Sequence, residues 1–186
     1  FLPKGELEGD SLEVIRDPLS TRPLSMKNTD NKTIMLANCK ACEPQFQKIN
    51  AKSQNGFVAG RNFLNNVIAL DAASRIYSNK FDASEFSVLG SAKNIPVCSS
   101  NDFEAAFPSV IHQWIWLVLK HRKLPQSFIN IFMAVYHEAC AVMTGTAGDT
   151  IILIKFLSGV LQGCPASAFL FNNAIDPFLS LFERTL

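Results

Sequence analysis

The chain has 186 residues, of which 48% are hydrophobic, and its formal net charge is +1. This length allows one domain or two small subdomains and is sufficient to bury a core. The near-neutral charge excludes a strongly basic chain, which free-standing nucleic-acid binders usually are. The five cysteines and three histidines lack the spacing of metal ligands. We interpret the cysteines as reduced, buried thiols and the histidines as ordinary surface or helix residues.

The first part of the chain predicts short strands or loops followed by two helices. Prolines punctuate residues 1–53, within which a helix is expected near residues 31–42. A turn with two glycines over residues 54–61 leads into a second helix over residues 62–78, because positions on one face recur at helical spacing. These positions are Phe63, Val67, Leu70, Ser74 and Tyr77.

The middle of the chain predicts a strand and two further helices. After a connecting loop, residues 97–103 are expected to form a strand that contains Asp102. A helix over residues 109–122 follows, and Pro125 begins another helix that runs to about Glu138. The inward-facing side chains of the helix over residues 109–122 are expected to be Val110, Trp114, Leu117 and Val118.

The last part predicts a hairpin and a helix. Residues 139–143 and 150–157 are rich in strand-forming residues and flank a glycine-containing turn, which is typical of an antiparallel hairpin. A second turn then leads into a helix over about residues 166–174. The apolar segments are all interrupted within the roughly 18 residues that a membrane-spanning helix needs, so we assign them to the core. The sequence leaves a membrane-embedded role for these segments open as the alternative.

Five short motifs follow one another along the chain, at residues 1–5, 22–28, 54–61, 102–110 and 159–165. In this order they resemble the motifs of the reverse transcriptases of non-LTR (LINE-type) retrotransposons. The resemblance implies an α+β fold: a fragment of the fingers and palm of a right-hand polymerase, with helices packed on a small, mainly antiparallel sheet. Residues 1–96 would be fingers-like, and residues 97–186 would be a partial palm.

The resemblance implies a catalytic role for Asp102 as a ligand of Mg²⁺. Polymerases use two such ions, about 3.5–4 Å apart, and Mg²⁺ prefers oxygen ligands. Phe107, five residues later, would lie beneath the nucleotide sugar and exclude a 2′-hydroxyl. The alternatives are a helix-capping role for Asp102 and a core position for Phe107.

Four other residues receive binding roles from the resemblance. Arg22 and Lys4 would hold the incoming triphosphate, for which a guanidinium and an ammonium are suited. Gln162 and Gly163 would position the template, because glycine allows close backbone approach and an amide both donates and accepts hydrogen bonds. The alternative for Arg22 and Lys4 is a solvated surface charge. The alternative for Gln162 and Gly163 is an ordinary turn before a helix. Arg61 resembles the other cations, but a structural role is equally compatible.

Two features depart from the family pattern. The family's third palm motif contains two adjacent aspartates a few tens of residues after Gln162, and these 186 residues contain no adjacent Asp pair. The strand expected before Asp102 is polar over residues 98–101, and Pro108 stands where a second Asp is common. One carboxylate cannot hold two Mg²⁺ ions. We therefore expect this chain alone to be inactive in DNA synthesis.

Two functions remain open. In the first, the chain is part of an RNA-directed DNA polymerase whose partners are an RNA template and a DNA primer. In the second, it is a retroelement-derived, non-catalytic structural or interaction subunit of a larger assembly. A protein partner would then cover the truncated palm, and membrane association of the assembly is left open. The absence of a signal peptide favours an intracellular location, nuclear or cytoplasmic for a retroelement enzyme.

Overall fold

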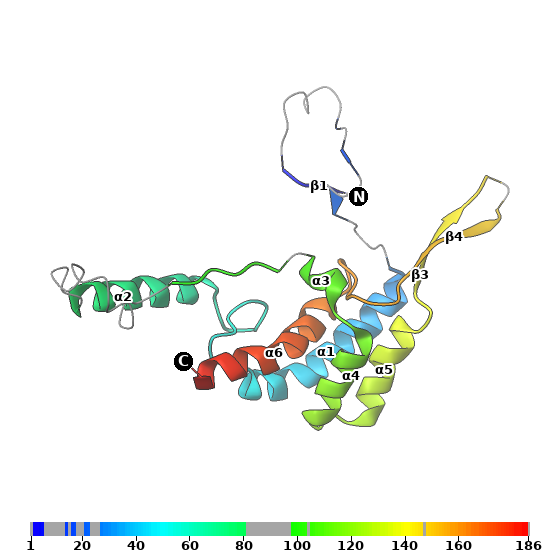
Figure 1. Ribbon diagram of the computed structural model, residues 1–186. Coiled ribbons are helices and arrows are strands. Elements are labelled where there is room, and N and C mark those ends of the chain that lie inside the picture. The colour runs from blue at the N-terminus through cyan, green and yellow to red at the C-terminus, as the bar shows by residue number, and fades with distance from the viewer. Residues whose placement is uncertain are drawn as a thin grey trace.

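The computed structural model describes residues 2–5, 14, 16–17, 21–22, 27–80, 98–103, 105–146 and 148–185. Its helices and strands confirm the predicted α+β class (Figure 1). The elements are β1 (Leu2–Pro3), β2 (Thr21–Arg22), α1 (Thr29–Ile49), α2 (Leu64–Lys80), α3 (Ala106–Ser109), α4 (His112–His121), α5 (Gln126–Tyr136), β3 (Cys140–Thr144), β4 (Thr150–Lys155) and α6 (Ser167–Thr185).

The hydrophobic core lies among helices α1, α4, α5 and α6. Helix α4 contacts both α5 and α6, and α1 contacts α5, so the four helices lie together in Figure 1. Removing their apolar side chains from water supplies the main driving force for this packing. The largest fully buried apolar side chains are Met35, Ile115, Leu119, Ile129, Phe132 and Leu170.

Helices α1 and α6 both run further than predicted. Helix α1 continues to Ile49 although Pro44 lies inside it, and α6 continues to Thr185 although Pro177 lies inside it. A proline inside a helix removes one backbone hydrogen bond and usually ends or kinks the helix. Here both helices bury residues around the proline, and this tertiary packing outweighs the local preference.

The predicted helix over residues 109–122 is wrong at its start. Residues 110 and 111 are extended, and α4 begins only at His112. Val110 stays extended because its carbonyl accepts a hydrogen bond from the amide of Gly159 (2.7 Å) instead of one from within the helix. The later start also changes the buried face. Val118 is buried as predicted, but Trp114 and Leu117 are 41% and 59% exposed.

The helix beginning at Pro125 and the hairpin are confirmed. Pro125 is the N-cap of α5, and β3 pairs antiparallel with β4, with an irregularity between Ala141 and Val142. The hairpin extends away from the helices in Figure 1. Its apolar side chains are exposed along both strands, namely Val142, Met143, Ile151, Ile152, Leu153 and Ile154.

Helix α2 is also confirmed, and it extends away from the four packed helices (Figure 1). The apolar positions that suggested an amphipathic helix are exposed, including Phe63, Val67, Leu70 and Tyr77. Within the described parts of the chain, no helix is both long enough and apolar enough to cross a membrane.

The predicted strand before Asp102 is wrong over the residues that the structure describes. Residues 98–103 form no regular secondary structure and are exposed. Burying the polar side chains of this segment without hydrogen bonds would cost free energy. None of the four described strands pairs with the segment. The connection expected over residues 79–96 lies mostly outside the described residues.

Candidate functional site

Two motifs that lie some fifty residues apart in the sequence are joined by backbone hydrogen bonds. The amide of Val160 donates to the carbonyl of Phe107 (2.9 Å), and the amide of Gly159 donates to the carbonyl of Val110 (2.7 Å). The Ser158 hydroxyl also donates to the carbonyl of Pro108 (3.4 Å). These bonds join residues 107–110, the later part of the Asp102 motif, to residues 158–160 at the start of the Gln162 motif.

Gly159 is required where these two segments meet. Its φ is +84°, a left-handed conformation that glycine adopts easily. A Cβ atom at this position would lie 2.7 Å from both the Cα and the carbonyl oxygen of Pro108. The close approach of the two backbones therefore depends on the absence of a side chain.

Phe107 lies where three motifs meet. Its ring is 4.9 Å from the ring of Phe171 on α6, in an edge-on arrangement, and 6.3 Å from the ring of Phe57. Its side chain is half-buried and packs against the hydrophobic core. The ring of Phe107 is thus packed on one side and partly open to solvent on the other. Its role beneath a nucleotide sugar stays a prediction.

The loop over residues 54–61 is fixed to α6 and to the end of α1. The Gln54 side-chain amide donates to Asn172 Oδ1 (2.9 Å), and Asn172 Nδ2 donates to the carbonyl of Gly56 (2.9 Å). The Arg61 guanidinium donates to the carbonyls of Ala51 (2.6 Å) and Gln54 (2.8 Å). Arg61 therefore binds backbone carbonyls just past the C-terminus of α1, which is a structural role.

Gln162 and Gly163 occupy a turn whose base is held by side chains. The amide of Leu161 donates to the Tyr136 hydroxyl oxygen (3.4 Å), and the Ser167 hydroxyl donates to the carbonyl of Leu161 (2.6 Å). Burial raises the pKa of the Tyr136 hydroxyl above its usual range. Gln162 is half-buried, and Gly163 is exposed with a φ of +98°. Hydrogen bonds thus fix the turn at Leu161, whereas Gly163 at its tip is exposed to solvent.

His112 is a helix residue, as interpreted from the sequence, and it also makes a long-range contact that the sequence did not indicate. Its Nε2 atom lies 2.7 Å from the carbonyl oxygen of Gly159. No spacing signal in the sequence indicated this contact, because the two residues are 47 positions apart.

Asp102 is exposed within the irregular segment over residues 98–103. The neighbouring Phe103 ring contacts the ring of Phe178 on α6, with centroids 6.4 Å apart. Over the described ranges, the chain contains no group of three or more His, Cys, Asp or Glu side chains that could hold a metal ion. Mg²⁺ takes about six oxygen ligands and keeps several of them as water. A single exposed carboxylate does not fit a complete Mg²⁺ site.

Lys4 and Arg22 belong to the β1–β2 pair, in which Leu2 is the partner of Arg22. Lys4 follows β1 directly and is exposed. Figure 1 shows this pair of strands outside the packed helices. The β1–β2 pairing therefore places Arg22 opposite Leu2, two residues before Lys4.

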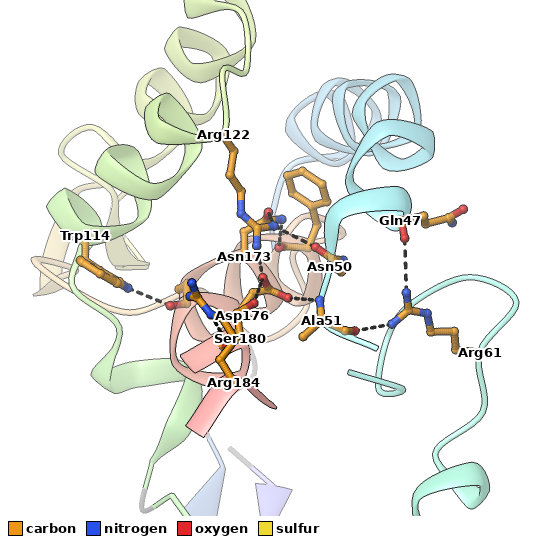
Figure 2. A network of polar contacts seen from close by, with 12 residues as sticks. Gln47, Asn50, Ala51, Arg61, Trp114, Arg122, Asn173, Asp176, Ser180 and Arg184 are labelled. Carbon is orange, nitrogen blue, oxygen red and sulfur yellow. Dashed lines mark hydrogen bonds and ion pairs between the residues drawn. The ribbon is translucent and has the colours of Figure 1, made fainter. Parts of the chain in front are cut away.

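A buried polar network that the sequence did not reveal ties the helices together (Figure 2). Asp176 is 1% exposed and accepts hydrogen bonds from the Arg122 guanidinium and from the amide of Ala51 (2.7 Å). Arg122 also donates to the side-chain oxygens of Asn50 (2.8 Å) and Asn173 (2.9 Å). These contacts satisfy the buried charges, so this network is structural.

Comparison with known proteins identifies the class. The sequence model of the reverse transcriptase (RNA-dependent DNA polymerase) family matches residues 9–186, so the chain belongs to this family. The chain is also similar to the Transposon TX1 uncharacterized 149 kDa protein of Xenopus laevis, with 27% identity over 165 residues. The match covers 89% of this chain and 12% of that protein. The predicted resemblance to retrotransposon reverse transcriptases is confirmed.

Proposed function

We propose that this chain forms the fingers and the first part of the palm of an RNA-directed DNA polymerase, which extends a DNA primer on an RNA template. The observation that supports this proposal is the convergence at Phe107. The loop over residues 54–61, the segment over residues 107–110 and the start of α6 all meet around this ring. Residues 54–61 and 107–110 belong to family motifs, and the motif over residues 159–165 leads into α6. A polymerase needs these motifs in one place.

In this proposal, Phe107 supports the sugar of the incoming nucleotide. Gln162 and Gly163 contact the template from the exposed tip of their turn. Lys4 and Arg22 bind the triphosphate, which requires the β1–β2 pair to approach the other segments when substrate binds. This approach is a requirement of the proposal.

Members of this family generally use divalent metal ions, and we assign to Asp102 one carboxylate ligand of such a site. In a two-Mg²⁺ mechanism the remaining acidic ligands would have to come from outside these 186 residues, since the sequence contains no adjacent Asp pair. The chain by itself is accordingly proposed to be inactive in DNA synthesis.

Primer extension tests the proposal. The 186-residue chain and the full open reading frame that encodes it are each incubated with an RNA template, a labelled DNA primer, dNTPs and Mg²⁺. The full-length protein is expected to extend the primer, and Asp102→Ala is expected to reduce extension to background. Asp71→Ala is the matched control, because Asp71 is an exposed acid on α2 that pairs with Arg75.

Either of two results would contradict the proposal. Extension by the isolated 186-residue chain, abolished by Asp102→Ala, would refute its inactivity. An open reading frame with no Asp pair within about a hundred residues downstream, together with no extension activity, would refute the enzymatic function.

A non-catalytic interaction subunit is the second candidate, and the exposed apolar surface favours it. Helix α2 and the β3–β4 hairpin both carry large apolar side chains in contact with solvent, and such surfaces commonly mark protein interfaces. Native mass spectrometry tests this candidate. A stable 20.5 kDa monomer at micromolar concentration would count against it.

A further inference from the structure

We propose that His112 is a positioning residue that fixes the backbone at Gly159 and thereby sets the position of the Gln162–Gly163 turn. The inference rests on the proposed function, in which that turn contacts the template. The hydrogen bond of His112 is to Gly159, three residues before Gln162. It would act through the buried segment between Gly159 and Leu161.

The geometry defines which atom donates. A carbonyl oxygen can only accept a hydrogen bond, so His112 Nε2, at 2.7 Å from the Gly159 oxygen, carries the hydrogen. The imidazole is held in this orientation by aromatic neighbours. Its centroid lies 5.2 Å from the ring of Tyr136, edge-on, and 6.1 Å from the ring of Trp116. The donor is therefore already oriented toward the carbonyl.

The contact is one part of a larger clamp. Three side chains from three helices bind backbone groups before the turn: His112 from α4 at Gly159, and Tyr136 from α5 and Ser167 from α6 at Leu161. On the other side, the amides of Gly159 and Val160 donate to the segment over residues 107–110. Both sides of this short segment are thus fixed.

The clamp ends where the chain reaches the surface. Residues 159–161 are buried, Gln162 is half-buried, and Gly163 is exposed. A surface turn on a rigid base loses less conformational freedom when a ligand orders it, which favours binding. His112 begins α4 directly after the segment over residues 107–111, so the same stretch of chain carries Phe107 and the bond to Gly159.

Two substitutions of His112 separate its hydrogen bond from its packing. His112→Phe keeps an aromatic ring but removes the donor. His112→Gln places an amide N–H near the position of the imidazole Nε2 and restores the donor. His121→Phe is the matched control, since His121 lies at the exposed end of the same helix.

The measurement is the Kd of the 186-residue chain for a fluorescent RNA template–DNA primer duplex, read by anisotropy. His112→Phe is expected to raise Kd about tenfold, the size expected when one hydrogen bond is lost. His112→Gln should stay within about threefold of the wild type. His121→Phe should leave Kd unchanged.

Amide hydrogen exchange at Gly159 and Val160 gives a second readout that needs no nucleic acid. His112→Phe should accelerate exchange at both amides, and His112→Gln should restore protection. If the Phe variant does not fold, His112→Asn replaces it, because the shorter Asn amide does not reach the Gly159 carbonyl.

The outcomes are distinguishable. If the wild type does not bind the duplex, the proposed function fails, and the template role of His112 fails with it. If the wild type binds and His112→Phe binds equally well, the inference alone is overturned. Unchanged exchange at Gly159 in His112→Phe, or equal weakening by Phe and Gln, would also overturn it.

Discussion

At the scale of single residues, Gly159 sets the tightest constraint in the candidate site. We expect Gly159→Ala to lower the free energy of unfolding by about 3 kcal/mol, because it adds steric overlap with Pro108 to the strain of a left-handed φ. Gly60→Ala is the control. Gly60 has a φ of +76° with nothing near its Cβ position, so only the strain of about 1–2 kcal/mol applies. Equal losses in urea unfolding would show that the close approach is unimportant.

Asp176 is a second residue whose removal has a defined cost. Asp176→Ala would leave the Arg122 guanidinium, whose side chain is 11% exposed, without its counter-charge. We expect a loss of about 3–5 kcal/mol in the free energy of unfolding. Asp71→Ala, which breaks the exposed pair with Arg75, should change it by less than about 1 kcal/mol. A loss below about 1 kcal/mol in Asp176→Ala would contradict a stabilising role for the network.

The buried thiols make stability depend on alkaline pH. Burial raises the pKa of Cys39 from 9.0 to about 12 and that of Cys42 from 9.0 to about 11. Between pH 9 and these values the unfolded chain releases thiol protons that the folded chain keeps. The stabilisation is therefore complete below pH 9 and is lost as pH rises through the folded pKa values. The slope due to Cys39 is at most about 1.4 kcal/mol per pH unit.

Urea unfolding between pH 8 and pH 10.5 measures this slope. Cys39→Val removes the titrating group at similar volume and should flatten the decline. Cys98→Ala is the control, because Cys98 is exposed. Identical slopes for the wild type and Cys39→Val would exclude this contribution.

At the scale of elements, the helices divide into a packed group and an exposed one. Helix α2 has 17 residues and almost no buried side chains, so it lacks the tertiary packing that supplies most helical stability in proteins. We expect its amides to exchange hydrogen at least about tenfold faster than those of α5, measured by mass spectrometry. Equal protection at low protein concentration would mean that another surface covers α2.

The elements also show what local sequence can predict. The Pro125 helix start and the β-rich arms of the hairpin are short-range signals, and both were confirmed. The start of α4 could not be predicted, because the bond that keeps Val110 extended comes from Gly159. The strand over residues 97–103 was predicted although residues 98–101 are polar, and the described residues 98–103 form no strand.

At the scale of the whole molecule, the motifs predicted which segments would meet but not how they meet. The resemblance placed the Asp102 and Gln162 motifs in one site, and backbone bonds between residues 107–110 and 158–160 join them. The contacts of His112 and Asp176 were missed because their partners lie 47 and 54 positions away. Such pairs leave no periodic pattern in a single sequence.

The Asp176 network has a consequence for how the chain can be divided. Its members Asn50 and Ala51 lie before the predicted boundary at residue 96, whereas Arg122 and Asp176 lie after it. A chain cut at that boundary would keep these noncovalent bonds between its halves. Fragments 1–96 and 97–186, expressed together, should therefore co-purify as a complex, and Asp176→Ala should weaken that complex, while the core packing of α1 against α5 still holds it. Recovery of two independently folded monomers would instead show that the boundary divides autonomous units.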